Sequence, residues 1–135
     1  MSVFDPRAQQ VKRFAGPARI VLKLADDARD RRDWATAASA YQQYLDEKPD
    51  HFAVWVQLGH ALKESGRLSA ALVAYGEALG LNENDADLLL NMGHLHKVMG
   101  LPEDAISYYR RSAERDGNAD AISELLHLGA ASSPG

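Results

Sequence analysis

Residues 52–85 read FAVWVQLGHALKESGRLSAALVAYGEALGLNEND, and this stretch of 34 residues sets the pattern for the chain on either side of it. Four series of similar residues recur at this spacing. The series are Tyr41, Tyr75 and Tyr109; Ala37, Ala71 and Ala105; Leu24, Leu58 and Met92; Ala25, Gly59 and Gly93. A fixed period of this length is typical of stacked structural repeats, in which neighbouring units bury one continuous core.

The composition excludes several classes of function. The chain has 135 residues, with 15 Lys and Arg against 19 Asp and Glu, and it has no cysteine. The net charge of −4 argues against a general nucleic-acid-binding protein, because such proteins carry a basic excess. Without cysteine there is no disulfide, no zinc–thiolate site and no thiol nucleophile. No apolar run approaches the ~18–20 residues of a membrane span, and no secretory signal begins the chain, so we expect a cytoplasmic protein or a piece of one.

Each repeat is predicted to be a pair of antiparallel helices. In the first unit, apolar residues recur at helical spacing over residues 18–30 and again over residues 34–48. Gly66 and Gly100 are expected to end the first helices of the next two units with positive φ. Pro102 suits the first position of the helix that follows. The buried face of the first helix is expected to hold Ile20, Val21, Leu24, Ala25 and Ala28.

Helix caps are predicted from polar residues at the unit boundaries. Asp33 is expected to cap the second helix of the first unit, and Asp50 and Asn84 the first helices of the second and third units. Asn118 is expected to cap a terminal helix that covers the last unit. The apolar stripe of this helix would be Ile122, Leu125 and Leu126, with Asp120, Ser123, Glu124 and His127 facing solvent.

The chain is divided accordingly into an N-terminal segment, three units and a C-terminal part. The segment is residues 1–17, in which Asp5-Pro6 can start a short helix; the alternative there is a frayed terminus. The three units are residues 18–51, 52–85 and 86–119, and residues 120–135 form a capping helix and a flexible tail.

The units resemble the tetratricopeptide repeat, a helix pair of 34 residues with a W-x2-L-G-x2-Y, A-x3-F and P signature. The resemblance covers about residues 18–119 and implies an all-α right-handed superhelix of three antiparallel helix pairs plus a C-terminal capping helix. The departures are Val21 and Leu89 for the first aromatic, and Tyr44 and Ser112 where alanine is usual. In the second unit the matching residues are Trp55, Leu58, Gly59, Leu62, Gly66, Ala71, Tyr75 and Ala78.

A narrower resemblance rests on VWVQLGHALKESGR at residues 54–67 and NMGHLHKVMG at residues 91–100. These stretches are similar to repeat modules that precede glycosyltransferase domains in bacterial cell-surface polysaccharide enzymes. The similarity implies an N-terminal regulatory or oligomerising module of a larger enzyme. Because these 135 residues hold no nucleotide-sugar domain, this stays an alternative.

The first helix of each unit lines the concave face in such stacks, so equivalent positions form rows along it, one step of about 8–10 Å per helix. Four rows are predicted to make the partner-binding face: Leu22, Val56 and Leu90; Lys23, Gln57 and Asn91; Asp26, His60 and His94; Arg29, Lys63 and Lys97. The basic row, beside two histidines and two amides, would hold an acidic peptide or another extended anionic ligand. The alternative is a set of solvated cations, because Asp30 and Glu64 weaken the field of Arg29 and Lys63.

One specialised partner is excluded by this face. Some members of the family grip a C-terminal carboxylate of chaperones with basic and asparagine side chains at set positions. Here those positions hold Leu22, Asp26, Gln57, Asp87 and Asn91. The cations of that clamp are missing and two acids stand in the set, so we reject this partner.

Neither catalysis nor metal or cofactor binding is expected. His94 and His96 point about 200° apart on a helix, and no cysteine or carboxylate completes a set with His60. No serine has a recognisable base partner, and no phosphate-cradling glycine loop appears. We therefore predict a non-enzymatic scaffold that docks a peptide or partner domain on its concave face, with self-association through an exposed end as a second mode. A chaperone for a secreted protein is a third class of function.

Overall fold

The computed structural model describes residues 13–129, and this part of the chain holds seven helices and no strand. The first helices of three pairs are α2 (Ala18–Asp30), α4 (Phe52–Glu64) and α6 (Ala86–Val98). The second helices are α3 (Trp34–Glu47), α5 (Leu68–Leu81) and α7 (Pro102–Asp116), and α8 (Ala119–His127) follows. The predicted all-α architecture of three helix pairs and a C-terminal helix is confirmed. The short helix proposed at Asp5-Pro6 and the tail from residue 130 lie outside the described residues.

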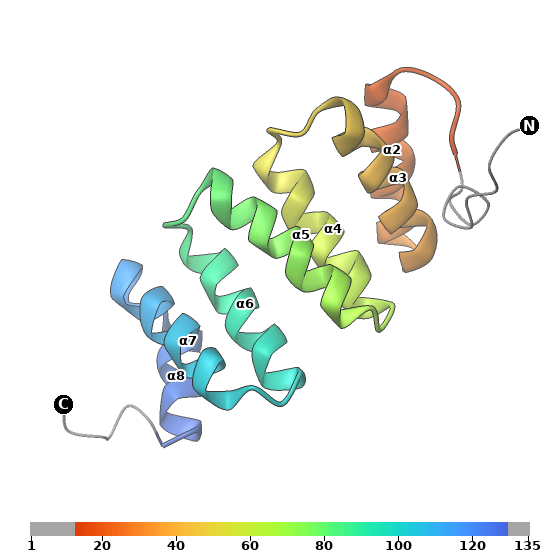
Figure 1. Cartoon of the computed structure of the whole chain (residues 1–135). Coiled ribbons are helices and arrows are strands. Elements are labelled where there is room, and N and C mark those ends of the chain that lie inside the picture. The colour runs from red at the N-terminus through yellow and green to blue at the C-terminus, as the bar shows by residue number, and fades with distance from the viewer. Residues whose placement is uncertain (1–12, 130–135) are drawn as a thin grey trace, which may run out of the picture.

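The helices pack in chain order. Each first helix packs on its own second helix, and α3 contacts α4, α5 contacts α6, and α7 contacts α8. Figure 1 shows the helices one after another in a single row, with α2 at one end and α8 at the other. Before α2, the Phe14 amide donates to Gln43 Oε1 at 2.9 Å and Gln43 Nε2 donates to the Phe14 carbonyl at 2.7 Å. These two bonds tie the chain before α2 to α3.

Close helix contacts explain the repeated glycine, alanine and tyrosine. Tyr41, Tyr75 and Tyr109 are wholly buried between the helices of their pairs. A Cβ atom at Gly59 would overlap the ring of Tyr75, and one at Gly93 would overlap the ring of Tyr109. A side chain at either glycine would therefore force helix and ring apart, which explains why a small residue recurs at this position.

The turn inside each pair has the same geometry, but only two of the three have glycine. Gly66 has φ 82° and Gly100 has φ 77°, as predicted, and the equivalent residue of the first pair is Arg32 with φ 62°. This left-handed conformation is unfavourable for a residue with a Cβ. The bond that closes each turn is conserved in length: Asp33 N to Ala28 O at 2.8 Å, Arg67 N to Leu62 O at 2.8 Å and Leu101 N to His96 O at 2.9 Å.

Two of the four predicted caps are confirmed. Asp33 accepts from the Thr36 amide, and Asn118 accepts from the amides of Asp120 and Ala121. The predicted caps at Asp50 and Asn84 are wrong by one residue, because α4 begins at residue 52 and α6 at residue 86. The N-cap of α4 is therefore His51, which makes no side-chain cap bond, and that of α6 is Asp85, which accepts from the Leu88 amide at 2.9 Å.

The apolar residues at the two ends of the stack are less buried than predicted. Ile20 and Leu24 remain 40% and 38% exposed, because no preceding helix of the described chain covers α2 as α3 covers α4. In α8 the buried residues are Ala121 and Leu125, while Ile122 and Leu126 are 41% and 61% exposed. Of the predicted stripe, Leu125 is buried as expected, whereas Ile122 and Leu126 make the outer side of α8 partly apolar.

Candidate functional site

The face formed by α2, α4 and α6 carries one polar row fixed from beneath by the buried tyrosines. The Tyr41 hydroxyl donates to Asp26 Oδ1 at 2.7 Å. The Tyr75 oxygen lies 2.6 Å from Nδ1 of His60, and the Tyr109 oxygen lies 2.8 Å from Nδ1 of His94. The two partners are 15 residues apart in every unit, so a core residue holds a surface residue in place three times along the stack.

Burial keeps the two tyrosine–histidine pairs neutral. It lowers the pKa of His60 and of His94 below the ordinary value of 6.5, and Lys63 lowers the pKa of His60 further. It also raises the pKa of Tyr75 and Tyr109. In the histidine tautomer with its proton on Nε2, each tyrosine hydroxyl donates to Nδ1. Within residues 13–129 the Nε2 atoms of His60 and His94 have no hydrogen-bond partner, so they are left for a ligand.

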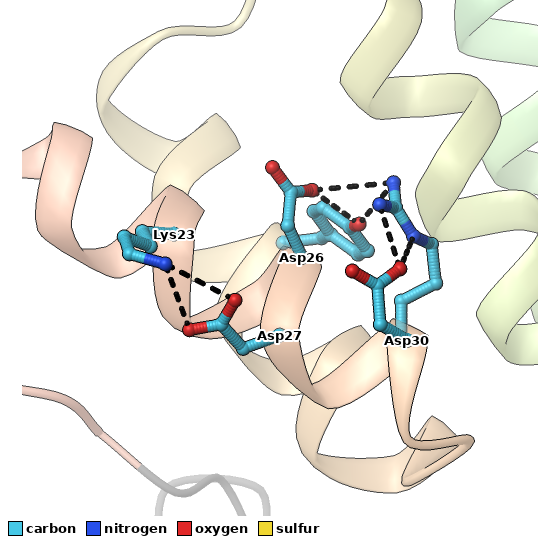
Figure 2. A network of polar contacts seen from close by, with 6 residues as sticks. Lys23, Asp26, Asp27 and Asp30 are labelled. Atoms are coloured by element: carbon cyan, nitrogen blue, oxygen red, sulfur yellow. Dashed lines mark hydrogen bonds and ion pairs between the residues drawn. The ribbon is translucent and has the colours of Figure 1, made fainter.

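The first helix, α2, is rich in charge, and the two cations that it contributes to the predicted rows are paired. Arg29 Nη2 donates to Asp30 Oδ1 at 2.9 Å, and Arg29 Nη1 lies 3.4 Å from Asp26 Oδ1. The hydrogen bond that Arg29 donates to Asp30 raises the pKa of Arg29. Lys23 Nζ lies 3.2 Å from both carboxylate oxygens of Asp27, and Figure 2 shows this pair apart from the cluster that holds Asp26 and Asp30. Lys23 and Arg29, the two cations that α2 contributes to the predicted rows, are therefore each paired within the helix.

At the other end of the basic row, Lys97 is paired with a residue that was expected to face solvent. Lys97 Nζ lies 2.8 Å from Glu124 Oε2 on α8, and this hydrogen bond lowers the pKa of Glu124. The prediction that Glu124 faces solvent, away from the stack, was wrong. Residue 124 is one period after Leu90, so Glu124 continues the row of Leu22, Val56 and Leu90. In the described part of the chain, Lys63 is the member of the basic row without an ion pair.

The remaining rows differ in what they leave accessible. Leu22 and Val56 are half-buried, but Leu90 is only 9% exposed and packs with Ala121 and Leu125 of α8. Leu90 was predicted to line the face and is instead part of the core, because α8 covers it. Gln57 and Asn91 are half-buried, and neither side chain makes a hydrogen bond within residues 13–129. These two amides are therefore accessible donors and acceptors at equivalent positions.

The third histidine considered above has a structural role. His96 is buried, its Nδ1–H donates to the Met92 carbonyl at 2.7 Å, and its ring stacks on Tyr108. Among residues 13–129, no three His, Cys, Asp or Glu side chains are grouped so that they could hold a metal ion.

No role for the hydroxyls of Tyr41, Tyr75 and Tyr109 was predicted from the sequence. The signal was present in the spacing, since a polar residue stands 15 positions before each tyrosine. Ser112 is a second case, because it replaces the usual alanine. Its buried hydroxyl donates a hydrogen bond to the Ala86 carbonyl at 2.8 Å, which an alanine could not make.

Of the helices in the described range, none has the length and apolar content needed to cross a membrane.

Three family models match the chain in overlapping stretches. Two are described as tetratricopeptide repeat and match residues 28–73 and 86–118; the third is described as TPR repeat and matches residues 59–100. Together they cover residues 28–118 without a gap. These descriptions name a repeat and no catalytic activity.

Two curated proteins are similar over most of the chain. Tetratricopeptide repeat protein 21B of Xenopus laevis is 26% identical over 114 residues, which are 79% of this chain and 8% of that protein. The general transcriptional corepressor ssn6 of Schizosaccharomyces pombe is 29% identical over 107 residues, which are 78% of this chain and 10% of that protein. The chain therefore spans a tenth or less of the length of these relatives.

Solved structures share the fold at low sequence identity. The first TPR of Spaghetti (RPAP3), bound to the HSP90 peptide SRMEEVD, superposes with a TM-score of 0.77 at 18% identity, over 87% of this chain and 94% of that chain. The MamA protein superposes with a TM-score of 0.77 at 20% identity, over 85% of this chain and 63% of that chain. Repeat period, helix-pair packing, family models and structural neighbours agree: the chain is a tetratricopeptide repeat protein.

Proposed function

We propose that this chain is a protein-interaction scaffold without catalysis of its own, and that the face of α2, α4 and α6 binds an extended segment of a partner protein. The observation that carries this proposal is the accessible amides of Gln57 and Asn91, which are half-buried and have no hydrogen-bond partner within residues 13–129. Half-buried polar groups without internal partners are favourable positions for contacts with a ligand. The Nε2 atoms of His60 and His94, which make no hydrogen bond within residues 13–129, add two further polar groups on this face.

The spacing of these groups suits a peptide backbone. Neighbouring helices of a stack are about 8–10 Å apart, and an extended chain advances about 3.3 Å per residue. One helix step therefore corresponds to about three residues of an extended ligand. An amide side chain presents a donor and an acceptor together, as a peptide group does. The Gln57–His60 set and the Asn91–His94 set would thus each contact one stretch of ligand backbone.

The charge on this face supports a narrower version of the predicted acidic partner. Arg29 is paired with Asp26 and Asp30, and Lys97 with Glu124. A ligand would have to compete with these carboxylates for either cation. Lys63 needs no such competition, so we propose that a single carboxylate of the partner lies beside it, and that most of the affinity comes from hydrogen bonds and apolar contact with Val56.

The experiment starts from a partner captured on the immobilised chain from a lysate of its native cells and identified by mass spectrometry. Its affinity is then measured for the wild type, for Gln57→Ala/Asn91→Ala and for Lys63→Ala. We expect the double variant to bind at least about 10-fold more weakly, and Lys63→Ala to have a reduced dependence on salt. The matched control is Ser69→Ala/Glu77→Ala, two exposed positions on α5. Equal affinity of the double variant and the wild type would refute the proposed face.

Self-association is a second proposal, supported by the two ends of the stack. Ile122 and Leu126 on α8, and Ile20 and Leu24 on α2, leave apolar surface at opposite ends. Such ends can pair head to tail between copies of one chain. We expect the mass measured by light scattering to rise with concentration, and to stay that of the monomer for Ile122→Glu/Leu126→Glu. A concentration-independent monomer in the wild type would rule this mode out.

Cytoplasmic location and the module of a larger bacterial glycosyltransferase remain predictions from the sequence. The second is decided by the reading frame after Gly135. A nucleotide-sugar domain encoded there would make this chain the regulatory or oligomerising part of an enzyme, and a stop codon would leave a free adaptor.

A further inference from the structure

A pocket of about 310 Å³ opens on the other side of the stack, between the second helices α3 and α5. Its floor comes from α4, and its residues include Ala38, Trp55, Leu62, Arg67, Ala70 and Ala74. Its volume is at the lower end of the ~300–1,000 Å³ typical of ligand pockets, so its size suits one large side chain. Trp55 and Leu62 lie on a different side of α4 from His60 and Lys63, because the helix turns about 100° per residue.

The next interface along the stack shows why this pocket is open. One period after Leu62 and Ala74 stand His96 and Tyr108. The rings of His96 and Tyr108 stack with centroids 4.9 Å apart and planes at 26°, so they fill the equivalent space between α5 and α7. The guanidinium of Arg111 lies 5.5 Å above the Tyr108 ring. In the pocket, the small Ala74 and the aliphatic Leu62 leave that space empty.

The walls of the pocket are fixed before any ligand enters. The Trp55 indole donates from Nε1 to the Pro49 carbonyl at 2.7 Å, which holds the ring in place. Leu58 in the floor and Ala74 on α5 are each 2% exposed, while Val73 at the mouth is 65% exposed. A preformed apolar pocket loses little conformational freedom on binding, which favours affinity. The exposed Val73 would in turn be covered by a ligand.

The charge of the pocket is carried by one residue. Arg67 is the single charged residue among those that line it. The side chain is exposed and makes no ion pair or side-chain hydrogen bond within residues 13–129. An unpaired guanidinium at the rim of an apolar pocket is complementary to a carboxylate, which it can bind through two N–H groups.

We propose that this pocket binds an aromatic side chain of a partner protein next to an acidic residue of the same segment, the ring against Trp55 and Ala74 and the carboxylate on Arg67. The ring would take the place that Tyr108 takes one repeat later. This site is separate from the face of α2, α4 and α6, so its failure would leave the proposed function untouched, and the reverse also holds.

The test uses nuclear magnetic resonance of the whole ¹⁵N-labelled chain with the peptide Ac-Ala-Phe-Asp-Ala-amide. We expect saturable shifts of the amides of Ala70 and Ala74 with a Kd on the order of 1 mM, typical of a single anchor. Replacing Phe by Ala in the peptide should abolish them, and replacing Asp by Asn should weaken binding about fivefold or more. The Arg67→Gln variant should bind the Asp and Asn peptides equally.

Filling the pocket gives the sharpest variant. Ala74→Tyr and Leu62→His/Ala74→Tyr copy the pair at 108 and 96 and should abolish the shifts, whereas Ser69→Ala, exposed on the same helix, should leave them unchanged. Should the filled variants not fold, Val73→Glu places a carboxylate at the exposed mouth and should weaken binding at least fivefold. The proposal is overturned by shifts that are absent at 20 mM peptide, by shifts that persist in the filled or Val73→Glu variants, or by N-acetyl-phenylalanine binding where the peptide does not, which would indicate a small aromatic acid as ligand.

Discussion

The Tyr75 hydroxyl lies 2.6 Å from Nδ1 of His60, so a wholly buried residue of α5 holds a side chain of α4 that belongs to the proposed binding face. The same relationship joins Tyr109 to His94 and Tyr41 to Asp26. A ring held in this way needs no ordering when a ligand arrives. Scaffold and binding face are therefore linked through three hydrogen bonds in the same place of each repeat.

Removing one hydroxyl should reveal the contribution of this link. We expect Tyr75→Phe to lower the free energy of unfolding by about 1 kcal/mol, because the ring still fills its space and one hydrogen bond is lost. Tyr41→Phe should lose about 1–2 kcal/mol, because its acceptor is a carboxylate, although a partly exposed one. Urea unfolding measures both, with Tyr108→Phe as the control. Equal stability of Tyr75→Phe and Tyr108→Phe would show that the bond to His60 contributes nothing.

The histidines should make stability dependent on pH in a defined range. Because folding lowers the pKa of His60 and His94 below 6.5, the unfolded chain binds more protons as the pH falls below that value. Stability should therefore be level above about pH 6.5 and decrease below it. Glu64 faces His60, and Glu124 and Lys97 face His94; the loss of the Glu124 bond belongs to a lower range, below 4.5, since its pKa is also lowered.

The variant that tests this is His60→Gln/His94→Gln, measured by urea unfolding between pH 5 and 8. We expect a flatter profile between pH 6.5 and 5 than in the wild type, while His127→Gln, exposed at the end of α8, should keep the wild-type slope. An unchanged slope in the double variant would assign the pH dependence to other groups.

Arg32 offers a stabilising change. Its φ of 62° is left-handed, as at Gly66 and Gly100 one and two periods later. Arg32→Gly should raise the free energy of unfolding by about 0.5–1 kcal/mol, the relief of strain less the greater entropy of glycine in the unfolded chain. Arg31→Gly, at the adjacent residue with φ −94°, should instead lower it. Chemical unfolding of the two variants side by side decides the matter, and a destabilised Arg32→Gly would contradict the strain at this turn.

The C-terminal helix should be held by apolar contact more than by its ion pair. Leu125→Ala should cost about 2–4 kcal/mol, whereas Leu126→Ala, which removes a side chain that is 61% exposed, should cost under about 0.5 kcal/mol. Lys97→Ala should cost at most about 1 kcal/mol because the pair is partly exposed. Amide hydrogen exchange of α8 reports its release directly. Faster exchange in Leu126→Ala than in Leu125→Ala would reverse the assigned packing of the helix.

The fold was predictable because the same 34-residue pattern occurs in three consecutive units. The 34-residue spacing of tyrosine, alanine and glycine gave the helix pairs, and Gly66 and Gly100 gave the turns. The repeat pattern could not predict which residues are buried at the two ends of the stack. Leu24 has the same place in its unit as the buried Leu58, yet it is exposed because no helix of the described chain precedes α2. Leu90 resembles Val56 in sequence, yet α8 covers it.

The positions of the site residues in rows were predictable from the sequence, but their ion pairs were not. The rows placed Gln57, His60, Asn91 and His94 on one face from periodicity alone. Ion pairing depends on side-chain geometry across helices, so the compensation of Lys97 by Glu124 required coordinates. The pocket beside Trp55 depends on a difference between units, Ala74 against Tyr108, and a search for what the repeats share passes over it.

The most direct test of the binding face is site-specific photo-crosslinking in the native cells. The photoreactive residue p-benzoyl-phenylalanine is placed at Gln57 in one variant and at Ser69, on the exposed side of α5, in another. We expect a discrete crosslinked protein from position 57 that is absent at position 69 and is lost when Asn91→Ala is added. A crosslink of the same protein from position 69 alone, or none from position 57, would contradict it.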